Sequence, residues 1–129
     1  MNNKDTLDVV GVICLDKFGR VLLVQGSGGK WSFPKGRRKE LETSYQGAIR
    51  EAKEEAGIEL TGRLVNAKIQ LRYGTYYVYA FSRSGEEIPL EKPMTADEIT
   101  QVSWVDMKSD TFQGYEKNAD LRAFVSPKV

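Results

Sequence analysis

Three glutamates that stand close together are the residues of this chain best suited to chemistry. Glu51, Glu54 and Glu55 fall in a stretch typical of a helix, residues 44–56, where side chains three and four positions apart share one face. Carboxylates gathered in this way raise one another's pKa unless positive charge lies among them. Because the chain has no His and only one Cys, these hard oxygen ligands suit Mg²⁺ or Mn²⁺ better than Zn²⁺. The spacing therefore predicts a site for a divalent cation, with Mg²⁺ the first choice.

The helix that must carry these glutamates has its own start and stop signals. Thr43, with Gln46 three positions later, predicts a capping box, and Gly57 can end the helix in a left-handed conformation. The apolar face consists of alanines that recur every four positions, Ala48, Ala52 and Ala56. Such a small-residue face can lie close against a sheet, so the acidic face is expected to point outward.

Two further groups are expected to support the cation site. Arg50 can pair with Glu42 or with a neighbour on the helix and hold the carboxylates in register. A backbone carbonyl, from Lys35 or Gly36, is a candidate metal ligand because the turn before the helix brings main chain close to it. Glycine permits such an approach.

The remaining segments predict the elements that surround this helix. β-rich runs predict strands over residues 7–15, 21–24, 64–72, 76–82 and 99–105, and residues 115–125 are typical of a short C-terminal helix. Residues 86–95 carry two prolines and predict an exposed loop, whereas the glycine-rich residues 26–29 fit either a plain connector or a substrate-facing loop. This order predicts an α/β fold with a mixed β-sheet between helices.

Composition narrows the class of protein. A chain of 129 residues with 40% hydrophobic residues fits one domain, residues 1–129, with a sizeable core. Its formal charge of +1 gives no overall field that would draw it onto nucleic acid or membrane. Because the first residues are polar and no apolar run approaches a membrane span, we expect a cytoplasmic or nuclear protein with no membrane partner. The one cysteine, Cys14, lies in an apolar strand and is expected to be a buried structural thiol.

Residues 36–58 resemble the Nudix box at every fixed position. The box reads Gly36, five residues, Glu42, seven residues, Arg50-Glu51, an apolar and a free position, Glu54-Glu55, a free position, Gly57 and an apolar residue. A solvated acidic helix face would not require glycine, arginine and glutamate at these offsets, so the whole pattern favours the functional interpretation.

The resemblance implies a fold and a class of reaction. It implies the Nudix α/β/α sandwich and hydrolysis of a phosphoanhydride bond in a nucleoside diphosphate linked to another group. It also implies that Glu51, Glu54 and Glu55 are metal ligands. Family members differ in the group that takes the proton from water. Here the candidates are Glu54 in the box and Glu98, which resembles the glutamate before a Trp-bearing strand in diadenosine polyphosphate hydrolases; an ordinary exposed carboxylate is the alternative for Glu98.

Several basic and aromatic residues are candidates for substrate binding. A basic cluster at the mouth of the expected site could bind phosphates, although a solvated basic turn is the alternative: Lys35, Arg37, Arg38 and Lys39. Arg72 is a weaker candidate. Tyr76 could stack on a base, since a tyrosine lies at a similar distance past the box in diadenosine polyphosphate hydrolases.

The substrate is left open among related phosphate chains. The lead-in Trp31-Ser-Phe-Pro-Lys-Gly36 resembles diadenosine polyphosphate hydrolases, diphosphoinositol polyphosphate phosphohydrolases and messenger-RNA decapping enzymes. Dinucleoside polyphosphates are favoured, with an RNA 5′ end or a diphosphoinositol as alternatives and oxidised nucleoside triphosphates as a further possibility. A non-catalytic nucleotide-binding module is the alternative of a different class, but such modules usually lose the box glutamates that this chain keeps. No protein partner is implied.

Overall fold

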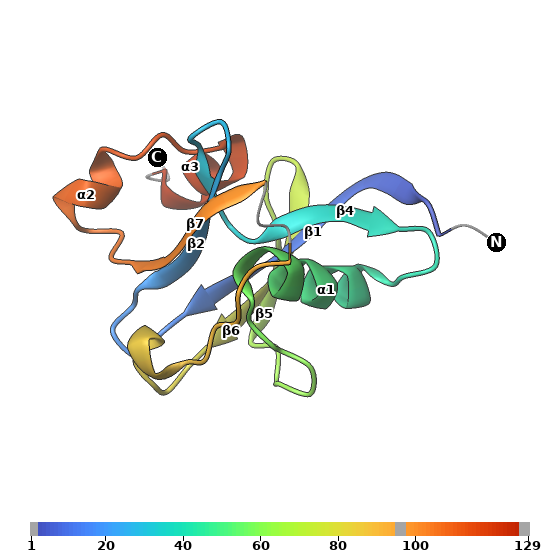
Figure 1. Ribbon diagram of the computed structural model, residues 1–129, viewed down its shortest axis with the longest axis horizontal. Helices are drawn as coiled ribbons and strands as arrows, with labels where there is room; N and C mark the ends of the chain where they lie inside the picture. Colours follow the sequence, from blue (N-terminus) through green and yellow to red (C-terminus); the bar gives the residue numbers. More distant parts are fainter. Residues whose placement is uncertain (1–2, 95–97, 127–129) are drawn as a thin grey trace.

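The computed structural model describes residues 3–94 and 98–126, which build a seven-stranded mixed sheet covered by helices (Figure 1). The strands are β1 (Asp5–Leu15), β2 (Val21–Gly26), β3 (Trp31–Ser32), β4 (Lys35–Lys39), β5 (Ala67–Gln70), β6 (Gly74–Ala80) and β7 (Ile99–Val105). The helices are α1 (Ser44–Ala56), the short 3-10 helix η1 (Gly85–Glu87), α2 (Asp110–Gln113) and α3 (Ala119–Val125).

Strand β1 lies at the centre of the sheet. The order of strands is β3-β2-β1-β6-β5, while β4 pairs with β1 and β7 pairs with β2. β1 runs parallel to β6 and antiparallel to β2 and β4, and the remaining pairs are antiparallel. The prediction of a mixed sheet is confirmed.

Helices cover both faces of the sheet. On one face, Val10 and Val12 of β1 pack with the alanines of α1, of which Ala48 and Ala52 are fully buried. On the other face, Ile13 of β1 belongs to a second buried cluster that includes residues of α2 and α3. Figure 1 shows α2 and α3 close together at one end of the molecule, apart from α1. The expected sandwich of helix, sheet and helix is therefore confirmed.

The buried thiol of Cys14 belongs to the core on the α1 side. Burial raises the pKa of this thiol, and the positive charge of Arg63 only partly opposes that effect. Because the thiolate is the nucleophilic form, Cys14 is a structural residue, as predicted.

The hairpin after α1 differs from its prediction. The strand expected over residues 64–72 is confined to β5, and β6 starts at Gly74, two residues earlier than expected, so the turn spans residues 71–73. Gly74 pairs with Val9 of β1, and the Tyr73 N–H donates to Asp120 Oδ1 at 2.8 Å. Contacts with residues that are distant in the sequence therefore determine the position of this turn.

The C-terminal helix is also shorter than predicted. It covers α3 only, where Asn118 is the N-cap, and α2 precedes it as a helix that the sequence did not indicate. Residues 115–118 instead run beside Trp31. The backbone N–H of Trp31 donates to the Glu116 carbonyl at 2.8 Å, and its ring stacks on the ring of Tyr115 with 4.3 Å between the ring centres. These contacts with Trp31 take the place of helical hydrogen bonds.

The segment predicted as an exposed loop over residues 86–95 is partly structured. It begins within η1, and Ile88 is buried against the core beside α1. The last residue of that prediction, Thr95, lies outside the described residues. The burial of one isoleucine corrects the expectation of a fully exposed loop.

Helix α1 begins and ends as predicted. Thr43 and Gln46 form the capping box, and Gly57 adopts the left-handed conformation with φ of 68°. The segment after η1 returns to this end of the helix, where the Glu91 N–H donates to the Gly57 carbonyl at 2.8 Å and the Met94 N–H donates to the Glu54 carbonyl at 2.9 Å. Over residues 3–94 and 98–126, no helix is long and apolar enough to cross a membrane.

The close packing at Gly57 leads to a prediction on stability. A Cβ at Gly57 would overlap the backbone of Glu91, whereas one at Gly62, which also has a positive φ of 81°, meets nothing within 4 Å. Alanine at either position suffers the cost of a left-handed conformation, about 1 kcal/mol. Gly57→Ala should lower the free energy of unfolding by a further ~2 kcal/mol because of overpacking. Urea denaturation of Gly57→Ala and of the matched control Gly62→Ala measures this difference, and equal losses would show that the contact with Glu91 is unimportant.

Candidate functional site

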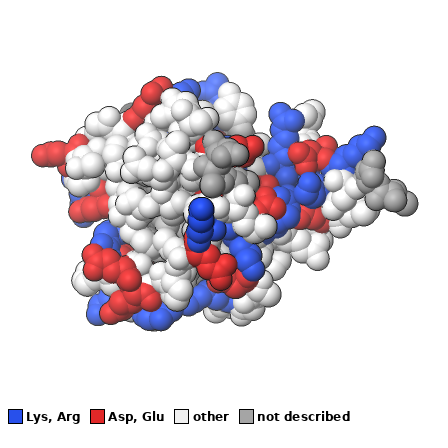
Figure 2. Space-filling view, viewed as in Figure 1, with Lys and Arg blue, Asp and Glu red and all other residues white. Residues whose placement is uncertain are grey.

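The glutamates of α1 line one pocket with a volume of 330 Å³, which is within the range of small-ligand sites. One wall comes from α1 and the other from β4 and the start of β1. Most of the predicted site residues meet here, and the lining consists of Asp5, Gly36, Arg37, Lys39, Arg50, Glu51, Glu54, Glu55 and Glu98. Figure 2 shows acidic and basic side chains gathered on the part of the molecule where Figure 1 places β4 and the start of β1.

The two walls lie close together at Gly36. A Cβ at this position would overlap the carboxyl group of Glu51, so only glycine allows β4 to lie this close to the helix. Glu51 is 8% exposed, and burial raises the pKa of its carboxyl group even though Arg50 opposes that shift. The glycine that opens the box motif therefore has a steric purpose.

Arg50 holds the carboxylates of the pocket together. It binds Glu42 with two nitrogens, Nε to Oε2 at 2.6 Å and Nη2 to Oε1 at 2.9 Å, which confirms the predicted pair. Its Nη1 donates to Glu51 Oε1 at 2.7 Å and to Glu54 Oε2 at 3.0 Å. The hydrogen bonds from Arg50 lower the pKa of Glu42, and those to Glu42 raise the pKa of the guanidinium. One side chain thus fixes three carboxylates in a partly buried place.

Glu55 lies on the other side of the helix face, against the start of β4. Its Oε1 accepts a hydrogen bond from the backbone N–H of Lys35 at 3.0 Å. Burial raises the pKa of Glu55 to about 7; the N–H and the charge of Lys35 oppose this shift, and the nearby charges of Glu51 and Glu98 add to it. Burial of the Glu55 carboxyl group is therefore the main cause of its raised pKa.

The donor set fits a hard divalent cation, although its members now face protein donors. Among residues 3–94 and 98–126, no group of three or more Cys, Asp or Glu side chains already has the arrangement of a metal site. Glu51 and Glu54 are turned toward Arg50, and Glu55 is turned toward the Lys35 N–H. Oxygen ligands around one pocket, two of them with a raised pKa, are nevertheless what Mg²⁺ would stabilise.

Glu98 reaches the pocket from a distant part of the chain. Its backbone carbonyl accepts a hydrogen bond from the Ser27 N–H at 3.0 Å, and the neighbouring Gly26 pairs with Ile99 of β7. The glycine-rich residues 26–29, for which the sequence left two interpretations, therefore support the backbone of Glu98. Only the pairing of β2 with β7 reveals this contact, so no local signal could have predicted it.

The basic cluster divides into residues with different surroundings. Arg38 Nη2 lies 2.8 Å from Asp8 Oδ2, and the same guanidinium donates to three carbonyls of residues 39–42. Lys39 Nζ lies 3.3 Å from Asp5 Oδ1 at the edge of the pocket. Arg37 is exposed and lines the pocket. The guanidinium of Arg38 is thus occupied by contacts within the protein, and we do not assign it a phosphate contact.

Two predicted substrate contacts lie elsewhere. Tyr76 is 0% exposed, and its hydroxyl donates to Asp120 Oδ2 at 2.7 Å, so the prediction that it stacks on a base is wrong. Arg72 is exposed in the turn between β5 and β6, where its guanidinium lies 5.4 Å from the ring of Tyr73, and it does not line the pocket.

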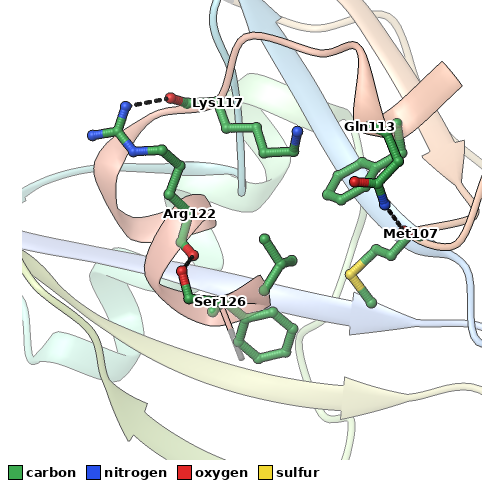
Figure 3. Close-up of a pocket in the computed structure, with 8 residues that line it drawn as sticks. Met107, Gln113, Lys117, Arg122 and Ser126 are labelled. Carbon is green, nitrogen blue, oxygen red and sulfur yellow. Dashed lines mark hydrogen bonds between the residues drawn. The ribbon is translucent and has the colours of Figure 1, made fainter. Parts of the chain in front are cut away.

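A larger cavity, of 480 Å³, lies beside α2 and α3 (Figure 3). Lys117 Nζ lies 4.6 Å from the ring centre of Phe112, and Arg122 donates to the Lys117 carbonyl at 3.3 Å. None of the residues predicted to take part in catalysis or to bind metal or substrate line this cavity. We therefore place the candidate site at the glutamates.

Comparison with known proteins identifies the family of the chain. Residues 5–121 match the family model of the NUDIX domain. The m7GpppN-mRNA hydrolase of Saccharomyces cerevisiae is 31% identical over 109 residues, which cover 80% of this chain and 11% of that protein. The mRNA-decapping enzyme subunit 2 of Arabidopsis thaliana is 33% identical over 105 residues, 78% of this chain and 28% of that protein. The chain thus spans only a small part of the length of these relatives.

Solved structures show the same fold. The Ap4A hydrolase of C. elegans superposes with a TM-score of 0.61 at 22% identity, over 82% of this chain and 84% of that one. The family model covers most of the chain, and the relatives share about a third of the aligned residues. On this evidence the chain belongs to the Nudix family.

Proposed function

We propose that this protein hydrolyses a phosphoanhydride bond in a nucleoside diphosphate-linked or polyphosphate substrate with the help of Mg²⁺, and that it prefers dinucleoside polyphosphates. One observation carries the proposal. The pocket brings together Glu51, Glu54 and Glu55 of α1 with Glu98 from a remote segment. A solvated helix face would have no reason to gather a fourth carboxylate from a distant segment of the chain.

The glutamates of the pocket and Arg50 have different roles in this proposal. Glu51, Glu54 and Glu55 hold the metal, with a backbone carbonyl of Lys35 or Gly36 as a further ligand. When bound, Mg²⁺ neutralises charge on the phosphate oxygens and lowers the pKa of a bound water. Glu98 or Glu54 takes the proton from the attacking water, and Arg50 keeps the carboxylates in place without touching the substrate.

The comparisons support a substrate with two nucleosides joined by a phosphate chain. The yeast relative is named for m7GpppN, in which three phosphates join two nucleosides, so an RNA cap belongs to the same chemical class as a dinucleoside polyphosphate. The Ap4A hydrolase supports the class through its fold alone. Hydrolysis at an RNA 5′ end is therefore the second candidate function. No observation favours a diphosphoinositol, and the retained carboxylates oppose a non-catalytic module.

We also propose that residues 1–129 form a single Nudix domain. Support comes from the family match over residues 5–121 and from the one sheet that joins β1 to β7.

A substrate panel tests the proposed function. It contains dinucleoside tetraphosphates and triphosphates, capped and 5′-triphosphorylated RNA, nucleotide sugars, oxidised nucleotides and diphosphoinositols, each with Mg²⁺ and with EDTA. We expect the highest kcat/KM on a dinucleoside polyphosphate or a cap, and no turnover with EDTA. The absence of Mg²⁺-dependent hydrolysis across the panel would refute the proposal.

Removal of a single carboxylate charge should abolish most turnover. Glu54→Gln and Glu55→Gln keep the shape of the side chain, and we expect each to lower kcat by about 100-fold or more with little change in melting temperature. Glu40→Gln is the matched control, because Glu40 is exposed at a free position of the box and does not line the pocket. Steady-state kinetics with Mg²⁺ provides the measurement, and near-normal kcat in both pocket variants would contradict the assignment.

The raised pKa of Glu55 predicts how stability depends on pH in EDTA. The ordinary pKa of a glutamate is 4.5, whereas in the folded protein the carboxyl group of Glu55 stays protonated up to about pH 7. The folded state thus binds the proton more tightly than the unfolded state, so the stabilisation is complete below the ordinary pKa and is lost as the pH rises through the folded value. The free energy of unfolding should therefore fall between about pH 5 and about pH 8.

Glu55→Gln should flatten this slope, and Glu59→Gln serves as its control. Hydrogen bonds from Thr61 lower the pKa of Glu59 to about 2, so its contribution is lost only as the pH falls well below the ordinary value of 4.5. Urea denaturation at several pH values measures the slope. A slope that Glu55→Gln leaves unchanged would show that Glu55 is not the group responsible.

A further inference from the structure

Three of the four cations in the basic cluster lie beside acidic side chains. Arg38 pairs with Asp8 and Lys39 pairs with Asp5, both across the β1–β4 ladder. The backbone N–H of Lys35 donates to Glu55 Oε1 at 3.0 Å, so this residue also lies beside a carboxyl group. Arg38 and Lys39 thus already have acidic partners before any phosphate binds.

Arg37 differs from its neighbours. Its exposed side chain lines the pocket, and within residues 3–94 and 98–126 no acidic side chain pairs with its guanidinium. Its backbone carbonyl accepts a hydrogen bond from Arg50 Nη2 at 3.1 Å. The arginine that fixes the carboxylates of α1 therefore also fixes the main chain from which the Arg37 side chain starts.

The charges of the pocket make this arginine important. Asp5 and four glutamates line it against Arg37, Lys39 and Arg50, so acidic groups outnumber basic ones by five to three. Arg50 is already bound to Glu42, Glu51 and Glu54, and Lys39 is bound to Asp5. A phosphate beyond those held by the metal would otherwise meet only negative charge.

We propose that Arg37 is a specificity-determining residue, which binds a phosphate adjoining those at the carboxylates and so favours chains of three or more phosphates over diphosphates. The inference rests on the proposed function, whose site it shares. Gly36, the neighbour of Arg37 on β4, lies against the carboxyl group of Glu51. The Arg37 side chain therefore leaves the backbone one residue away from this carboxylate. Its planar fork suits two oxygens of one phosphate.

Calorimetric titration with inorganic tripolyphosphate and inorganic pyrophosphate, both with Mg²⁺, tests this inference without requiring turnover. Arg37→Gln should raise the Kd for tripolyphosphate about tenfold and the Kd for pyrophosphate much less, because a charge-assisted hydrogen bond is lost only with the longer chain. Arg37→Lys should recover part of the affinity. Arg83→Gln removes the same charge from an exposed residue that does not line the pocket, and it should leave both values unchanged.

Each other result would overturn the inference. Equal weakening of both ligands by Arg37→Gln would refute the preference for chain length, and unchanged Kd values would refute the contact itself. A similar loss of affinity in Arg83→Gln would show that the effect comes from net charge alone. Absence of tripolyphosphate binding to the wild-type protein would also refute the contact.

Kinetics on dinucleoside diphosphates and tetraphosphates separates this inference from the proposed function. We expect Arg37→Gln to raise KM for the tetraphosphate about tenfold with kcat within about twofold. If the wild-type protein binds tripolyphosphate through Arg37 but hydrolyses nothing, the proposed function fails and the inference stands. If the protein hydrolyses the tetraphosphate and Arg37→Gln is unaffected, the inference fails and the function stands.

Discussion

The mutual repulsion of carboxylates on one helix face is the constraint on which the rest of this structure depends. Three glutamates within two turns of α1 would destabilise the helix if nothing positive lay among them. Arg50 supplies part of this positive charge, because its guanidinium binds Glu42, Glu51 and Glu54. The raised pKa of Glu55 shows that the compensation is incomplete, because burial there is met only by the N–H and the charge of Lys35. In the proposed function, a divalent cation bound at the glutamates would complete this balance of charge.

The packing of α1 serves the same end. The alanine face lets the helix lie on the sheet at short range, and Gly36 lets β4 come up against Glu51. At the other end of α1, Gly57 allows the chain after η1 to pack on the helix and to bond the Glu54 carbonyl through Met94. Small residues therefore appear where the fold brings main chain close to the acidic helix, and larger ones would push the walls of the pocket apart.

Local sequence predicted what local geometry determines. The bounds of α1 and both of its caps follow from residue types within a short stretch, and they are confirmed. The prediction that Arg50 pairs with Glu42 or a helix neighbour is confirmed as well, since Arg50 binds Glu42, Glu51 and Glu54. Contacts set by the pairing of strands could not be predicted. The partners Arg38 and Asp8 are 30 residues apart, and only the register of β1 with β4 brings them together. The burial of Tyr76 likewise depends on Asp120, 44 residues further along the chain. A pattern of residue types shows which groups can react, but the fold decides which of them are free to meet a ligand.

Paramagnetic broadening by Mn²⁺ is the most direct test of the claim that the glutamates of α1 form a metal site. In a protein labelled with ¹⁵N and ¹³C, substoichiometric Mn²⁺ should broaden the signals of Glu51, Glu54 and Glu55 first, together with the backbone of Lys35 and Gly36, and excess Mg²⁺ should restore them. Broadening centred on another part of the chain, or none at concentrations that support hydrolysis, would contradict the account.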